Sequence, residues 1–81
     1  MGKAGKALKQ VLEIHGISQN KLAVTIGTGR SNVHRWVNEM TDPVAEAVLE
    51  IRDALKKISP AAAEEFIRLY LENSSEDEKQ P

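Results

Sequence analysis

Two short helices joined by a glycine-containing turn are predicted for residues 18–38, and this stretch constrains the fold more than any other part of the chain. Its sequence is SQNKLAVTIGTGRSNVHRWVN. We expect one helix from Gln19 to about Ile26, a turn at residues 27–29 and a second helix from Arg30 to about Asn38. The basis is that apolar residues recur with helical spacing on both sides of the turn, at Leu22, Ala23, Ile26, Val33, Trp36 and Val37.

The outward positions of the second helix are rich in hydrogen-bond donors. They carry Arg30, Ser31, Asn32, His34, Arg35 and Asn38. A helix can enter the major groove of B-DNA, where its exposed side chains reach the base edges. A second helix must then hold it at a fixed angle, which requires a small residue at the helix contact and a sharp turn. Ala23 and Gly27 meet these requirements, and Val33 and Trp36 would anchor the inner side. The pattern therefore predicts a pair of helices that binds a DNA groove.

One further helix is predicted before this pair and another after it. The first spans roughly Lys6 to His15 and ends at Gly16, which suits the left-handed residue that follows a helix. Ser18 is expected to cap the helix that begins at Gln19. Asp42-Pro43 is a typical helix start, and an amphipathic stretch from Val44 to about Ile58 follows it.

The start signal is repeated at Ser59-Pro60, so a last helix is expected from Pro60 to about Glu72. Residues 73–81, NSSEDEKQP, contain no apolar residue and are expected to form a disordered acidic tail. No stretch has the alternation of a strand. The predicted fold is all-α, a compact domain of five helices at residues 1–72.

Charge is distributed unevenly along the chain. Residues 1–38 contain six Lys or Arg and one acidic residue, a net charge of +5, whereas residues 39–81 contain five basic and eleven acidic residues, a net charge of −6. The overall charge of −1 conceals this asymmetry. A polyanion such as DNA would be attracted to the first half, which contains the predicted helix pair.

Several classes of protein are disfavoured. The chain has no cysteine, so it can form neither a disulfide nor a thiolate metal site. The two histidines are nineteen residues apart, and the Gly27-Thr28-Gly29 segment lacks the lysine of a phosphate-binding loop. We therefore expect no enzyme activity, no metal and no cofactor. Charges interrupt every long apolar stretch and the N-terminus has no signal-peptide run, so a cytoplasmic protein is expected.

The motif resembles the helix-turn-helix of the Cro/repressor (XRE) family. Its matching residues are Gln19, Leu22-Ala23, Ile26-Gly27, Val33 and Trp36, and the segment Gly27-Thr28-Gly29-Arg30-Ser31 is similar to lambda repressor-like domains. Asp42-Pro43 and the helix after it also match, so the resemblance covers about residues 5–58. Two positions depart from the family pattern: Thr28 is polar, and the glycine common after the recognition helix is absent from Val37-Asn38-Glu39.

The resemblance implies a sequence-specific transcriptional regulator in a bacterial or phage-type cytoplasm, associated with the nucleoid. A repressor is the expected role, and an activator is the alternative, because the position of the operator decides between the two. The partner of the regulator would be double-stranded DNA. Gln19 would contact a phosphate and brace the recognition helix, and Arg30, Ser31, His34 and Arg35 would face the groove. Asn32 and Asn38 would lie near the DNA backbone. The implied DNA-binding set is Gln19, Asn20, Arg30, Ser31, Asn32, His34, Arg35 and Asn38.

The apolar band of the last helix leaves two interpretations open. Phe66, Ile67, Tyr70 and Leu71 could pack on the domain's own core, or they could form a homodimer contact. A dimer would place two recognition helices about 34–36 Å apart on a palindromic site. A different hypothesis is a helical interaction module, such as an antitoxin, that binds another protein through this band. Glu39 would repel phosphate if its side chain pointed toward the DNA.

Overall fold

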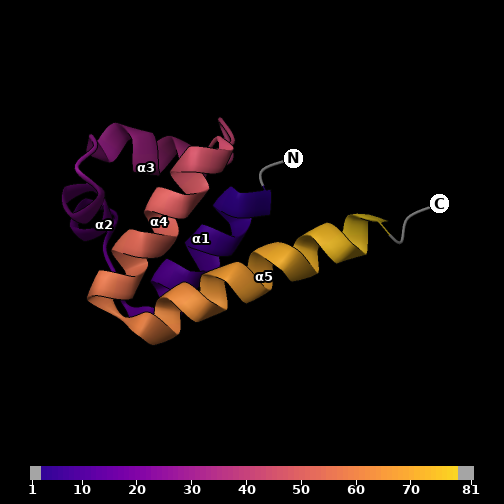
Figure 1. Cartoon of the computed structure of the whole chain (residues 1–81). Coiled ribbons are helices and arrows are strands. Elements are labelled where there is room, and N and C mark those ends of the chain that lie inside the picture. The colour runs from indigo at the N-terminus through magenta and orange to yellow at the C-terminus, as the bar shows by residue number, and fades with distance from the viewer. Residues whose placement is uncertain (1–2, 79–81) are drawn as a thin grey trace.

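The computed structural model describes residues 3–78, and the side chains of residues 4–72. Within that range the chain forms five α-helices and no strand (Figure 1). The helices are α1 (Lys3–His15), α2 (Gln19–Ile26), α3 (Arg30–Val37), α4 (Ala45–Ile58) and α5 (Pro60–Glu78). The predicted compact all-α fold of five helices is confirmed. None of the described helices combines the length and apolar composition needed to cross a membrane.

The core lies where α1 and α4 pack along the first half of α5, and α2 and α3 cover its other end (Figure 1). Its largest fully buried side chains are Phe66, Leu8, Leu22, Ile51, Leu55, Val11 and Val33. These come from all five helices, so no helix pair could bury its apolar stripe alone. Burial of each such side chain contributes about 1.5–3 kcal/mol, which is how a domain of this size offsets its loss of chain entropy.

Three helices end in the same hydrogen-bonded arrangement. After α1 and α2 the left-handed residue is glycine: Gly16 has φ 65° and Gly27 has φ 92°. Ile17 N–H bonds to Leu12 C=O at 2.9 Å, and Thr28 N–H bonds to Ala23 C=O at 3.0 Å, the bonds expected of such a helix end. Both glycine positions were predicted, and both are confirmed. The third end, after α3, has no glycine and is described below.

Two predicted helix caps are also confirmed. The Ser18 hydroxyl accepts a hydrogen bond from Lys21 N–H at 2.9 Å and so caps α2. The Ser59 hydroxyl lies 3.4 Å from Ala62 N, and α5 begins at Pro60. Proline is harmless there because the first helical residues have no intrahelical partner for their N–H groups.

The start predicted for α4 is wrong. Asp42 does not cap the helix and Pro43 is not its first residue, because the backbone stays extended through Val44 at φ −70° and ψ 167°. Regular bonding begins when Val48 N–H donates to Val44 C=O at 3.0 Å. Asp42 and Pro43 lie in the non-helical connection between α3 and α4, and they do not begin a helix. The point where the helix begins depends on how the connection crosses from α3 to α4, which local sequence does not specify.

Helices α1 and α5 are both longer than predicted. α1 begins at Lys3, three residues before the expected start, since Ala4 and Gly5 are buried against the rest of the domain. The backbone of α5 continues to Glu78, where no glycine or proline stops it, and extends beyond the other helices (Figure 1). Residues 79–81 lie outside the described part, and the division of the chain into a domain ending at residue 72 and an acidic tail stays a prediction.

A polar contact joins the end of α1 to α5. His15 Nε2 lies 2.9 Å from Glu65 Oε1, and both side chains are largely buried. The second oxygen of Glu65 accepts from Arg68 at 3.1 Å, and Arg68 also pairs with Glu72 at 3.2 Å. From the sequence, His15 was expected only to be the last residue of the first helix. The contact with Glu65 joins residues fifty positions apart, so no local pattern could predict it.

Gly5 marks the closest approach between α1 and α3. A Cβ atom placed on Gly5 would lie 2.0 Å from the backbone oxygen of Trp36 and 3.1 Å from its carbonyl carbon. Those atoms are backbone at the end of α3, so they cannot rotate away. Gly5 therefore lets α1 support the C-terminal end of α3 at a distance that no other residue permits.

We expect Gly5→Ala to destabilise the domain. In an exposed helix the change would be favourable by about 0.5–1 kcal/mol, but here the added methyl overlaps a fixed carbonyl, and forced repacking of this kind costs about 1–3 kcal/mol. The measurement is the urea midpoint of unfolding. Lys6→Ala, at the exposed neighbouring position, is the control and should change stability by less than about 0.5 kcal/mol. A Gly5→Ala variant as stable as this control would contradict the close approach.

Candidate nucleic-acid interface

α2 and α3 are held together by the apolar residues that face each other across the turn. Leu22 and Ala23 of α2 are buried, as are Val33 and Val37 of α3. Ala23 is 2% exposed, consistent with its expected role as the small residue at the helix contact. Trp36 is partly buried and packs against the core, so it is an anchor of α3. The helix pair therefore has the arrangement expected from residues 18–38.

The opposite side of α3 faces solvent. Arg30, Ser31, His34 and Arg35 are all exposed. An open groove runs between this face and the beginning of α2, and it is lined by Ser18, Gln19, Asn20, Arg30, Ser31 and His34. Five of those six residues belong to the DNA-binding set implied by the resemblance. The fold thus brings together residues from two helices into one polar, positively charged surface.

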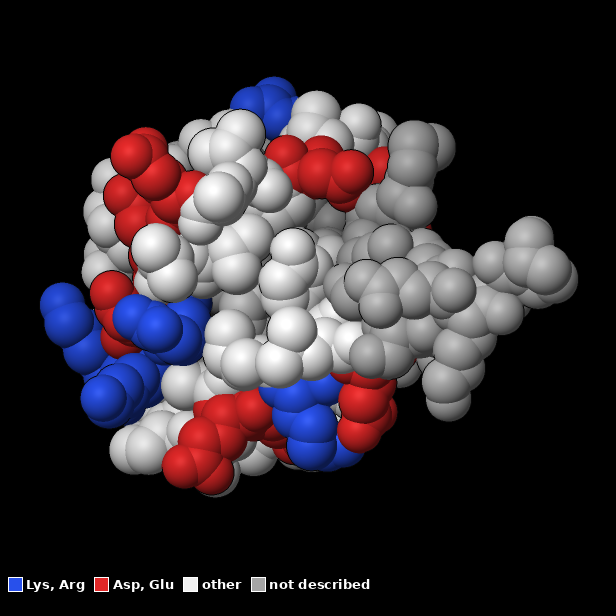
Figure 2. Space-filling view, turned by 45° about the vertical axis from the view of Figure 1, so that its right-hand side comes forward, with Lys and Arg blue, Asp and Glu red and all other residues white. Residues whose placement is uncertain are grey.

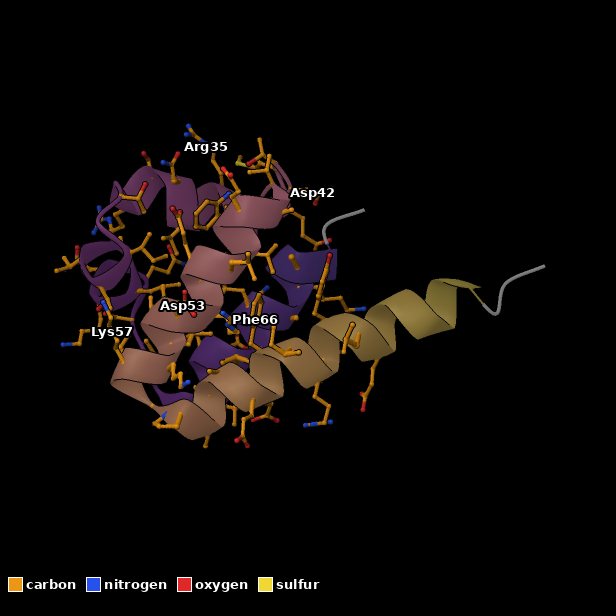
Figure 3. The ribbon with its side chains drawn as sticks, viewed as in Figure 1. Arg35, Asp42, Asp53, Lys57 and Phe66 are labelled. Carbon is orange, nitrogen blue, oxygen red and sulfur yellow. The ribbon has the colours of Figure 1, made fainter. Side chains whose placement is uncertain are left out.

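Asn32 has a different place from the other predicted contacts. Its side chain is half-buried, and its Nδ2 donates to the Thr28 hydroxyl at 2.8 Å. Its Oδ1 accepts a short hydrogen bond from the guanidinium of Arg35, which extends from α3 away from the domain (Figure 3). Asn32 therefore connects the turn to Arg35 and limits the positions that this guanidinium can reach. Thr28, which departs from the family pattern, supplies the oxygen that orients Asn32.

Asn38 is held against the last turn of α3. Its Nδ2 donates to the backbone oxygen of His34 at 2.8 Å and lies 3.2 Å from Nδ1 of the His34 ring. The same backbone oxygen also accepts from Asn38 N–H at 3.1 Å. The amide thus satisfies the end of α3 and sets the position of His34, while its own side chain remains exposed. This cap function was not expected from the sequence.

Glu39 occupies the left-handed position that follows α3. Its φ is 59°, the only positive φ of a non-glycine residue in the described part of the chain. Glu39 N–H bonds to Trp36 C=O at 3.1 Å and Met40 N–H bonds to Arg35 C=O at 2.9 Å, which repeats the arrangement found after α1 and α2. Its Cγ lies 3.8 Å from the Cβ position of Gly5, so its stem runs over the first turn of α1.

The apolar band of α5 is divided between core and surface. Phe66 is fully buried, so a dimer contact through its side chain is excluded in this fold. Its ring stacks on Tyr70, with centroids 6.4 Å apart and an interplanar angle of 11°. Tyr70 and Ile67 are partly buried against the core, and Leu71 is 57% exposed. The band thus serves the domain's own core at Phe66 and leaves an apolar edge toward Leu71.

Comparison with known proteins gives one similarity. Over 51 residues the chain is 37% identical to a protein of Methanocaldococcus jannaschii named "Putative HTH-type transcriptional regulatory protein MJ1164". The matched stretch is 63% of this chain and 16% of that protein, so the chain spans a small part of its relative's length. No protein-family model matches the chain, and no solved structure matches it.

This similarity is a distant and partial homology to a helix-turn-helix protein. It agrees with the helix pair found in the fold, and it does not distinguish the Cro/repressor family from other helix-turn-helix families. The relative is archaeal, which differs from the bacterial or phage-type source that the resemblance implied.

Glu39→Gly is expected to stabilise the domain by roughly 0.5–1 kcal/mol. A left-handed conformation costs a residue with a side chain about 1–2 kcal/mol, and glycine removes this strain. Part of the gain is offset, because glycine has more conformational freedom in the unfolded chain. Urea unfolding measures the difference. Glu39→Gln is the control, because it removes the charge and keeps the strained side chain, so it should give no such gain. Equal stabilisation by both variants would show that charge, not backbone strain, determines the effect.

Proposed function

We propose that this chain is a sequence-specific DNA-binding transcriptional regulator of the Cro/repressor, lambda repressor-like type. The observation that carries the proposal is the convergence of Gln19, Asn20, Arg30, Ser31 and His34 on one open groove between α2 and α3. These residues come from both helices of the pair, and all of them can donate hydrogen bonds to DNA. The partial homology to a helix-turn-helix regulator supports the same conclusion.

In this proposal α3 enters the major groove with its exposed face toward the base edges. Arg30 and Arg35 are the candidates for guanine, because a guanidinium can bond to both acceptors on that base. The bond from Arg35 to Asn32 restricts Arg35 before DNA arrives, which lowers the entropy lost on binding. Gln19, Asn20 and Ser31 contact phosphates and fix the register of the helix. His34, positioned by Asn38, lies at the middle of the face.

The proposal includes a wider role. The chain acts as a repressor in the cytoplasm, where it is associated with the nucleoid, and covers the DNA that it binds. DNA binding of this kind requires no cofactor and no catalytic group. The net charge of +5 on residues 1–38 attracts the duplex, and the acidic remainder of the chain keeps non-specific binding weak.

Arg35→Ala is expected to weaken binding to the preferred duplex by roughly 5- to 150-fold, the equivalent of about 1–3 kcal/mol for one bidentate base contact. The duplex is first selected from a random DNA pool with the unaltered protein, and affinity is then measured by fluorescence anisotropy at fixed salt. Lys57→Ala is the control, since Lys57 is exposed at the end of α4 and lines neither the groove on α3 nor the groove between α4 and α5.

Arg35→Ala should also relax selectivity at one base pair, whereas loss of a phosphate contact weakens all sequences alike. The proposed function fails if the pool yields no preferred sequence at low salt. It also fails if Arg35→Ala and Lys57→Ala have the same effect on the selected duplex.

We further propose that the protein binds DNA as a homodimer through the exposed edge of α5. Ile67 and Leu71 line an open groove between α4 and α5 with Arg52, Lys56, Glu64 and Arg68. Three of its charged side chains are basic and one is acidic, so the contact between two copies depends on the exposed apolar residues of this edge. Figure 2 shows one side of the molecule, on which uncharged side chains separate groups of acidic and basic ones.

Leu71→Asp is expected to convert the dimer to a monomer, because it places a charge in an apolar contact while leaving the fold intact at a position that is 57% exposed. Sedimentation velocity over a range of protein concentrations measures the change. Val24→Asp, at a position on α2 that is 69% exposed, should leave the oligomeric state unchanged. An unaltered protein that stays monomeric when bound to one duplex would refute the dimer and leave DNA binding intact.

A further inference from the structure

A second open groove adjoins the one on α3. It lies where the end of α1 meets the start of α2 and the end of α3, and Lys9, Glu13, Ser18, Gln19 and Asn38 are among its lining residues. Ser18 and Gln19 line both grooves. The proposed DNA-binding surface therefore continues from α3, across the start of α2, onto α1.

Lys9 is the basic residue that α1 contributes to this groove. Its side chain is exposed, and no ion pair between described side chains includes it. Glu13 lies four residues further on and lines the same groove. A lysine that precedes a glutamate by four residues is the less favourable order for a helical pair, since both charges then oppose the helix dipole. The ammonium group of Lys9 is thus available to an anion from outside.

The neighbours of Lys9 are suited to a phosphate. Gln19, one of the proposed phosphate contacts, lines the groove beside it, and Asn38 closes the groove at the end of α3. Asn38 Nδ2 donates to His34 C=O and lies 3.2 Å from the His34 ring, so this amide orders the end of the groove. Lys9 and Gln19 therefore supply donors from two helices to the same groove.

We propose that Lys9 binds a DNA backbone phosphate next to the bases contacted by α3, as a positioning residue of the interface. The proposal rests on the proposed function, because it needs a duplex seated on α3. Lysine acts here as a flexible point charge, without the fixed geometry of an arginine, so it sets the register of the protein on DNA and carries no base preference. It extends the interface to α1, outside the helix-turn-helix.

The test is the salt dependence of binding to the duplex selected with the unaltered protein. Each phosphate contact contributes about 0.9 to the slope of log affinity against log salt concentration. Lys9→Gln should therefore lower the magnitude of that slope by about 0.9. If the two affinities are equal at about 1 M salt, the same relation makes Lys9→Gln bind roughly eight-fold more weakly at about 0.1 M salt. The loss should be equal on the selected duplex and on duplexes with single base changes. Lys9→Arg should retain the slope.

Lys57→Gln is the matched control, because it removes the same charge from an exposed position at the end of α4 that lines neither groove (Figure 3). Circular dichroism establishes that each variant is folded. The proposal is overturned if Lys9→Gln leaves the slope unchanged or alters it no more than Lys57→Gln does. It is also overturned if the loss depends on base sequence. If the unaltered protein binds no duplex, the proposed function itself is refuted, and so is the phosphate contact of Lys9.

Discussion

The buried side of α3 determines what its exposed side can do. Val33 and Val37 fix the helix to the core, and the carbonyl of Trp36 lies directly over Gly5 of α1. α3 is only eight residues long, so isolated it would not be stable in water. Its conformation and its angle to α2 therefore depend on tertiary packing. The arrangement of Arg30, Ser31, His34 and Arg35 on one face is a consequence of that packing.

Polar contacts then fix the side chains on this exposed face. Thr28, Asn32 and Arg35 form one chain of hydrogen bonds, and Asn38 with His34 forms another. Asn32 and Arg35 are three positions apart and His34 and Asn38 are four apart, so each pair lies on one face of α3, while Thr28 belongs to the turn before it. Each restricts a side chain that would otherwise sample many rotamers. A side chain that is already restricted loses less conformational entropy when a ligand binds to it. The two asparagines thus act through Arg35 and His34.

At the end of α3, backbone strain at Glu39 destabilises the fold, and the hydrogen bonds that close the helix stabilise it. Glu39 accepts a strained left-handed backbone where α1 and α2 have glycine. The strain is tolerated because the two hydrogen bonds that close the helix are both made. The stem of Glu39 packs over Gly5, so the same residue connects the end of α3 to the first turn of α1. The position of α3 therefore depends on three residues outside it: Gly5, Ala23 and Glu39.

Local sequence patterns determined the helices and most of the candidate site. Helical spacing of apolar residues predicted α2, α3 and the body of α4, and the positions of Gly16, Gly27, Ser18 and Pro60 predicted helix ends. These signals succeed because capping and left-handed turns involve residues within about one turn of each other. The set of exposed residues on α3 followed from the same periodicity.

Only the tertiary structure decided which helix ends and faces meet. The start of α1, the burial of Phe66, the contact of His15 with Glu65 and the groove that joins Lys9 to Gln19 all depend on residues distant in sequence. The beginning of α4 was misplaced because a loop between packed helices takes its course from the positions of both. Periodicity determines which side of a helix is apolar, whereas packing determines what that side touches and which polar residues gather beside it.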